Sequence, residues 1–212
     1  MRLRKKPWVA EALTGFSDIV LQNAGEEMQG KWAGLFARNW PLHVELGAGR
    51  GKFVSGMAEQ YSQTNFVGLE AQQDVLYYAA RKIRERELAN VRLLVFNVFE
   101  IETVFAPGEI DRLYINFCDP WPKNRHAKRR LTHAGFLAKY RTVLKPGGQL
   151  WLKTDNRPLF EFSLEQFAEF GLTLDNISYD LHNSGFTDNV MTEYETKFSS
   201  LGQPIYRCEA TF

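Results

Sequence analysis

The chain has 212 residues, of which 44% are hydrophobic and 14% aromatic, so it can bury one substantial core and is not a low-complexity chain. No apolar run approaches the roughly 20 residues that span a bilayer, and no apolar segment follows the basic start as it would in a secretory signal. The only cysteines, Cys118 and Cys208, lack the spacing of a metal site or a disulfide framework. We expect one cytoplasmic domain over residues 1–212, with no metal, as a monomer or a homodimer.

The net charge of +1 conceals two basic segments. The first six residues carry four Lys or Arg, and residues 119–130 carry five Lys or Arg with one Asp. A mildly acidic body with two such segments predicts local contacts with a polyanion. On charge alone, a solvated loop and terminus explain the pattern equally well.

In chain order, residues 1–40 show weak periodicity and are expected to form a basic N-terminal extension that drapes over the domain or orders on binding. From residue 41 onward, short apolar runs alternate with amphipathic stretches. The expected strands are 42–46, 65–70, 91–96, 112–117, 148–154, 172–179 and 205–212. The expected helices are 51–60, 74–86, 132–143 and 158–170, with a short turn at 101–105. This alternation predicts an α/β fold with a doubly wound, Rossmann-like, seven-stranded sheet. The sheet should be mostly parallel, with an antiparallel edge at the C-terminus, because no clear helix separates the last two strands.

The first strand is followed by a glycine-rich turn with Gly47, Gly49 and Gly51. Glycines let a backbone turn sharply and approach a ligand closely. Lys52 stands where the dinucleotide fingerprint needs its last glycine, which counts against a nicotinamide or flavin enzyme. Alone, the motif could also be only a tight turn.

Polar residues at three strand ends indicate the ligand. Glu45 ends the first strand, where it could contact the amino group of an amino-acid-like ligand, and Glu70 ends the second at the distance expected for a ribose diol. Asn97 follows the third strand, where its amide could meet an adenine amino group or simply form a turn. Adenosine with an amino-acid tail is S-adenosylmethionine, and this pattern resembles that of class I methyltransferases.

The fourth strand leads into Asp119-Pro120-Trp121-Pro122. The prolines fix the backbone, the tryptophan can pack on an aromatic face, and the aspartate presents a carboxylate. In a doubly wound sheet the ligand crevice lies at the carboxyl ends of the strands, so Asp119 should converge there with Glu45, Glu70 and Asn97. A rigid corner packed on the core is the alternative, and the basic run that follows argues against it.

Three motifs in order resemble the bacterial tRNA (guanine-N(7)-)-methyltransferase family over nearly the whole chain. They are Asp119-Pro-Trp-Pro-Lys with its basic continuation to Arg130, Lys153-Thr154-Asp155-Asn156, and the run from Thr192 to Phe198. Two positions depart from the family pattern: Asn97 stands where Asp is common, and the acid that ends the second strand, Glu70, is the longer one.

The resemblance implies S-adenosylmethionine as cofactor, tRNA as substrate, and formation of 7-methylguanosine at a variable-loop guanosine. It implies three groups of site residues. Cofactor contacts fall on Glu45, Gly47, Gly49, Gly51, Glu70, Asn97 and Asp119, with Asp119 also the catalytic residue. Substrate contacts fall on Lys123, Asp155, Thr192, Glu193, Tyr194 and Glu195, and RNA contacts on Arg125, His126, Lys128, Arg129 and Arg130.

The chemistry of guanine N7 defines the role expected of Asp119. N7 carries an in-plane lone pair and no proton, so its methylation needs alignment rather than a general base. Asp119 is therefore expected to orient the reactants, while Asp155, Glu193 or Glu195 could accept from the N1–H and exocyclic amine that distinguish guanine.

Two other functions fit part of the pattern. Asp-Pro-Trp could be a relative of the Asp-Pro-Pro-aromatic motif of amino-group methylases, or the chain could be an RNA-binding protein whose glycine turn is only structural.

Overall fold

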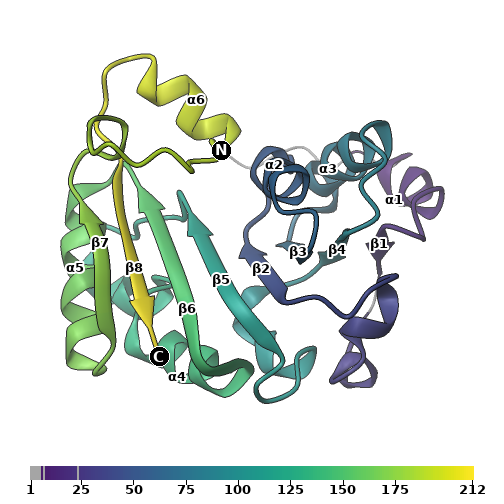
Figure 1. Cartoon of the computed structure of the whole chain (residues 1–212), viewed down its shortest axis with the longest axis horizontal. Helices are drawn as coiled ribbons and strands as arrows, with labels where there is room; N and C mark the ends of the chain where they lie inside the picture. Colours follow the sequence, from purple (N-terminus) through teal and green to yellow (C-terminus); the bar gives the residue numbers. More distant parts are fainter. Residues whose placement is uncertain (1–5, 7, 23) are drawn as a thin grey trace.

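The computed structural model describes residue 6, residues 8–22 and residues 24–212. Eight strands form one sheet in the order β1-β4-β3-β2-β5-β6-β8-β7 (Figure 1). Strand β8 runs antiparallel to its neighbours β6 and β7, and every other pair is parallel. The strands are β1 Val20–Leu21, β2 Leu42–Leu46, β3 Asn65–Glu70, β4 Val91–Val95, β5 Ile110–Asn116, β6 Leu144–Thr154, β7 Thr173–Ser178 and β8 Tyr206–Thr211. The predicted doubly wound, mostly parallel sheet with an antiparallel C-terminal edge is confirmed.

Helices cover both faces of the sheet, so the molecule has three layers (Figure 1). The α-helices are α1 Trp8–Thr14, α2 Lys52–Gln60, α3 Gln73–Glu85, α4 Ala134–Val143, α5 Arg157–Glu169 and α6 Glu193–Ser199. The 3₁₀ helices are η1 Glu26–Met28, η2 Trp32–Leu35, η3 Val98–Thr103, η4 Asn124–Arg129 and η5 Leu181–Asn183. One apolar core joins α1, α2 and α3 to the sheet, and a second joins α4 and α5 to the opposite face. No helix among the described residues is long and apolar enough to cross a membrane.

The structure corrects two expectations. The sheet has eight strands rather than seven, because β1 pairs with β4 inside the stretch expected to be an extension. Its two residues are too few for a strand to show a period. The structure also has a helix, α6, between β7 and β8, where we expected none.

Part of the N-terminal stretch belongs to the packed domain. Val9 and Leu13 of α1 are fully buried and contribute to the core beneath α3, and Trp32 is buried in the other core. The basic residues Arg2, Arg4 and Lys5 lie outside the described residues. Residues 8–22 and 24–35 therefore extend the domain, and their weak periodicity reflects short elements.

The start of α5 follows from local chemistry. Asn156 caps α5 by accepting a hydrogen bond from the backbone N–H of Leu159 at 2.9 Å, and Pro158 occupies the first turn. Asp155 lies between the end of β6 and this cap, so both elements restrict its position.

The chain winds outward from β2 through β3 and β4 and then crosses back to β5, so β2 and β5 flank the point where the winding reverses.

Candidate active site

The turn after β2 is built from glycines with left-handed backbone conformations. The φ angle is +87° at Gly47, +56° at Gly49 and +79° at Gly51, a region that glycine adopts without strain. A Cβ atom at Gly47 or Gly49 would enter open space, whereas one at Gly51 would lie 2.7 Å from Cβ of Ala79 in α3. The first two glycines thus leave room for a ligand beside the backbone, and the third lets α2 and α3 pack closely.

Glu70 and Asn97 lie beside this turn at the ends of β3 and β4. The Glu70 carboxylate accepts hydrogen bonds from the backbone N–H groups of Gly49 at 3.1 Å and Gln72 at 2.9 Å. Asn97 caps η3 by accepting from the backbone N–H of Phe99 at 3.2 Å. Both side chains are therefore fixed by backbone groups. A carboxylate keeps lone pairs for further donors, so Glu70 suits a ribose diol.

Two adjoining pockets, of about 240 and 340 Å³, open where β2 meets β5. They share Gly47, Asn116 and Phe117. The first is also lined by Glu45, Gly49, Phe53, Thr192, Glu193 and Tyr194, and the second by Glu70, Asn97, Asp119, Trp121 and Arg129. Ligands of doubly wound folds bind in the crevice at this reversal point. The predicted convergence of the four strand ends is observed in these pockets.

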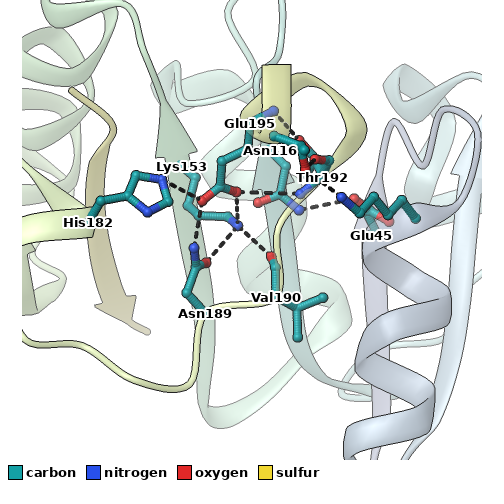
Figure 2. Close-up of polar contacts among 10 residues, drawn as sticks. Glu45, Asn116, Lys153, His182, Asn189, Val190, Thr192 and Glu195 are labelled. Atoms are coloured by element: carbon teal, nitrogen blue, oxygen red, sulfur yellow. Dashed lines mark hydrogen bonds and ion pairs between the residues drawn. The ribbon is translucent and has the colours of Figure 1, made fainter. Parts of the chain in front are cut away.

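Glu45 is a buried acid in the wall of the first pocket, only 3% exposed. Its Oε1 accepts from Nδ2 of Asn116 at 3.0 Å (Figure 2). Within the described part of the chain, its Oε2 has no hydrogen-bond partner. Desolvation raises the pKa of Glu45 to about 8, against the opposing effect of the bond from Asn116. A buried, unpartnered carboxylate oxygen beside a ligand-sized cavity suits a cationic amino group.

The segment after β5 holds Asp119 on a strained backbone. Phe117 and Trp121 have φ angles of +52° and +41°, which non-glycine residues adopt at a cost of about 1–3 kcal/mol each. Between them, Asp119 is exposed and lines the second pocket. Burial raises the pKa of the neighbouring Cys118 thiol to about 12, so this cysteine is no nucleophile at neutral pH. Strained backbone of this kind clusters at functional sites.

The basic residues that follow point in different directions. Lys123, Arg125, Lys128 and Arg129 are exposed. The guanidinium carbon of Arg129 also lies 4.9 Å from the centre of the Trp121 ring, and the His126 ring is nearly perpendicular to that ring, with the two ring centres 5.8 Å apart. Arg129 and His126 therefore pack on Trp121, and the charge of Arg129 still reaches solvent.

Arg130 departs most clearly from the expected RNA contact. It is half-buried and donates hydrogen bonds to the backbone carbonyl oxygens of Pro120 and Trp121. Its guanidinium faces the chain rather than the solvent.

The opposite wall of the first pocket is the segment that leads into α6. The Thr192 hydroxyl accepts from the backbone N–H of Glu195 at 2.9 Å, and the Glu195 carboxylate accepts from the backbone N–H of Thr192 at 3.4 Å, so the pair forms a capping box. Glu195 is fully buried and pairs with Nζ of Lys153 at 2.7 Å (Figure 2). Asn189 Nδ2 also donates to it, at 2.6 Å, and His182 Nε2 lies 3.3 Å away. We had expected Glu195 to contact the substrate, and the structure places it inside the protein instead, where it supports the wall.

Lys153 connects this wall to the sheet. Its ammonium donates to the side chain of Asn189 at 3.0 Å and the carbonyl of Val190 at 2.8 Å, besides Glu195 (Figure 2). Desolvation lowers the pKa of Lys153, and the charge of Glu195 opposes that effect. On the neighbouring strand, Asn116 is paired with Lys153 in register. Asn116, which donates to Glu45, and Lys153, which pairs with Glu195 of α6, are therefore neighbours in the sheet.

Glu193 and Tyr194 line the first pocket, and Asp155 lies beside Tyr194. Glu193 accepts from Nζ of Lys82 at 2.6 Å and from the backbone N–H of Lys52, at the start of α2, at 3.3 Å. The Tyr194 hydroxyl donates to Asp155 at 2.9 Å, and its ring centre lies 4.9 Å from that of Phe117. Burial, reinforced by the bond to Asp155, raises the pKa of Tyr194 to about 12.

Sequence reasoning missed three residues that shape the site. Asn116 and Lys153 are buried at adjacent strand ends, and Phe117 lines both pockets. A lysine in the otherwise apolar stretch 150–154 was a signal that β6 carries a buried charge near its end. Nothing local in the sequence identified Glu195 as its partner.

Comparisons with known proteins agree with this geometry. A family model described as "Putative methyltransferase" matches residues 39–208. The fold also resembles that of a solved 16S rRNA methyltransferase, KamB, with a TM-score of 0.60 at 15% identity, covering 81% of this chain and 86% of that one. The chain is thus a methyltransferase with a Rossmann-like fold.

Two curated relatives define the family within that class. The tRNA (guanine-N(7)-)-methyltransferase of Bacillus subtilis (strain 168) is 49% identical over 209 residues, which cover 99% of this chain and 98% of the relative. The enzyme of the same name from Streptococcus suis (strain 05ZYH33) is 48% identical over 212 residues and covers all of both chains. The chain belongs to the tRNA (guanine-N(7)-)-methyltransferase family.

Proposed function

We propose that this chain transfers a methyl group from S-adenosylmethionine to N7 of a guanosine in tRNA. The observation that carries the proposal is the pair of adjoining pockets, which brings the glycine turn, the Asp119 carboxylate and Arg129 of the basic segment together. As the family resemblance implies, the target would be a variable-loop guanosine, and such a substrate places the enzyme in the cytoplasm.

The residues present fit the methyl donor. The unpartnered oxygen of Glu45 suits its ammonium group, the open turn at Gly47 and Gly49 leaves room beside the backbone, and Glu70 suits its ribose. Asn97 would face the adenine. When bound, S-adenosylmethionine supplies a sulfonium-activated methyl group. Asn97 lacks the charge of the Asp usual in the family, but it keeps an acceptor oxygen.

Alignment is the main task of the protein groups. Guanine N7 needs no deprotonation, so the rate depends on holding N7 in line with the methyl carbon and its leaving sulfur. Asp119, exposed on a strained and therefore fixed backbone, would orient the reactants at the pocket mouth. Phe117 and Tyr194 present aromatic faces nearby, suited to a planar base.

We infer that the substrate contacts are Lys123, Asp155, Thr192, Glu193 and Tyr194. Buried Glu195 supports the segment that carries the last three. Asp155 and Glu193 supply carboxylates that can accept from the N1–H and amine of guanine. In the structure both are occupied, by Tyr194 and Lys82 respectively, so base binding would exchange these partners. Exposed Arg125 and Lys128 would contact phosphates, with Arg129 at the pocket edge.

Nucleoside analysis of methylated tRNA tests this proposal. We would incubate unmodified bulk tRNA with the protein and labelled S-adenosylmethionine, digest it, and identify the methylated nucleoside. 7-Methylguanosine is the expected product. Methylation of an exocyclic amine would favour the amino-group methylase alternative. A failure of S-adenosylmethionine to bind saturably would refute both enzyme functions.

A further inference from the structure

Arg130 ends the basic segment, yet its side chain folds back onto the backbone that follows Asp119. Its Nε lies 3.2 Å from the carbonyl oxygen of Pro120 and 3.3 Å from that of Trp121, and its Nη2 donates to the Trp121 oxygen at 3.1 Å. One guanidinium thus spans two consecutive carbonyl groups. The guanidinium presents its donors in one plane and in fixed directions, whereas a lysine ammonium is a compact charge on a flexible stem and would not hold this geometry.

The backbone that Arg130 holds needs support. Trp121 has a φ of +41°, a left-handed conformation that persists in a non-glycine residue only where the surrounding structure enforces it. Hydrogen bonds from a charged donor are stronger than neutral ones. The Arg130 bonds therefore oppose relaxation of the turn that presents Asp119.

A second contact fixes the guanidinium itself. Its central carbon lies 4.3 Å from the centre of the Phe162 ring in α5. Helix α5 packs on the sheet and begins directly after the Asp155 strand end. Arg130 therefore connects the backbone at Pro120 and Trp121, next to Asp119, to helix α5.

We propose that Arg130 is a positioning residue for methyl transfer and not a phosphate ligand. By fixing the carbonyls of Pro120 and Trp121, it holds the Asp119 carboxylate at the pocket mouth. It acts on the rate of the chemical step and contributes little to tRNA affinity. The inference rests on the proposed function and replaces the expectation that Arg130 contacts RNA.

Replacement by lysine separates the two roles, because lysine keeps the charge and loses the fork. We would compare R130K and R130A with R125K and R125A, since Arg125 lies in the same segment and is exposed. The measurements are the single-turnover rate at saturating tRNA and S-adenosylmethionine, and the Kd for tRNA as a function of salt. Thermal unfolding and donor binding report whether each variant is folded.

Both Arg130 variants should lower the single-turnover rate by about 10- to 100-fold, the scale expected for a displaced reacting group. Their Kd for tRNA should stay within about twofold of the wild-type value, with an unchanged salt slope. The Arg125 variants should act on binding instead: R125A weakens tRNA binding and lowers the salt slope by about 0.9, and R125K, which keeps the charge, weakens binding less. F162L, which removes only the aromatic face, should lower the rate less than R130K does.

A wild-type rate in R130K, together with an R130A salt slope reduced as in R125A, would overturn the proposal and make Arg130 a phosphate contact. If R130A fails to fold, R130K and F162L decide the question, because each keeps a positive charge at residue 130. If the wild-type protein transfers no methyl group to tRNA, the proposed function fails instead.

Discussion

Replacing Glu45 with glutamine tests whether this buried acid binds the methyl donor through its charge. Glutamine keeps the size of the side chain and an oxygen that can accept from Asn116, and it removes only the ionisable group. The wild-type carboxyl has a pKa of about 8 because it is desolvated. It is thus about one-tenth ionised at pH 7 and half ionised at pH 8.

The expected magnitude follows from these fractions. A ligand ammonium pairs with the ionised form, and apparent affinity scales with the population of the competent form. The affinity ratio of wild type to E45Q should therefore rise about fivefold from pH 7 to pH 8 and only about twofold more by pH 9. At pH 7, ionisation of Glu45 on binding should release about 0.9 proton in the wild type, and E45Q should lack this release.

Isothermal titration with S-adenosylmethionine, in two buffers of different ionisation enthalpy, measures both quantities. The donor's own amino group titrates in the same pH range, so the affinities of both proteins are expressed for its ammonium form. A ratio that does not change from pH 6 to pH 9, or equal proton release by the two proteins, would refute the reasoning. The free energy of unfolding of the ligand-free proteins provides a control, because its expected change with pH is opposite in direction to the change in affinity. The folded pKa of Glu45 exceeds the unfolded value of 4.5, so the wild type should lose stability relative to E45Q as pH rises toward 8.

Three further substitutions probe other parts of the structure. D119A should lower kcat by at least about 100-fold through lost alignment, with tRNA affinity nearly unchanged in a filter-binding assay; a parallel loss of affinity would contradict a positioning role. K153M removes the ammonium that pairs with the buried Glu195 carboxylate and should lower the free energy of unfolding by about 3–5 kcal/mol in urea titrations; wild-type stability would show that the pair is dispensable. Burial lowers the pKa of His43 to about 3, so its stabilising effect is present above its unfolded value of 6.5 and lost as pH falls. H43F should flatten this part of the acid-unfolding curve, and an unchanged slope would exclude His43 as its source.

The convergence of the strand ends could be predicted from the sequence because its signals are local. The glycine turn, the acids at the ends of β2 and β3 and the rigid Asp119 segment each follow a strand, and parallel strands bring their carboxyl ends to one edge. Strands β2 and β3 were predicted with the bounds that the structure has.

The substrate half was harder to predict because side-chain direction there depends on distant contacts. Glu193 and Glu195 are two residues apart, yet the first faces the pocket mouth and the second is enclosed with Lys153, 42 residues earlier in the chain. Arg129 and Arg130 are adjacent, yet one packs on the Trp121 ring and the other binds its carbonyl. Composition identified the basic run, but it carried no information about which arginines face inward.

The bond from the start of α2 to Glu193 has a consequence for phosphate binding at this helix. The first turn of a helix carries free N–H groups and a partial positive charge, which in many nucleotide-binding proteins attract a phosphate. Here a carboxylate of the chain itself already occupies one of those N–H groups, and Glu45 and Glu70 line the same cleft. A phosphate placed at this N–H group would meet the Glu193 carboxylate. The start of α2 is therefore less suited to a phosphate than an unoccupied helix start would be.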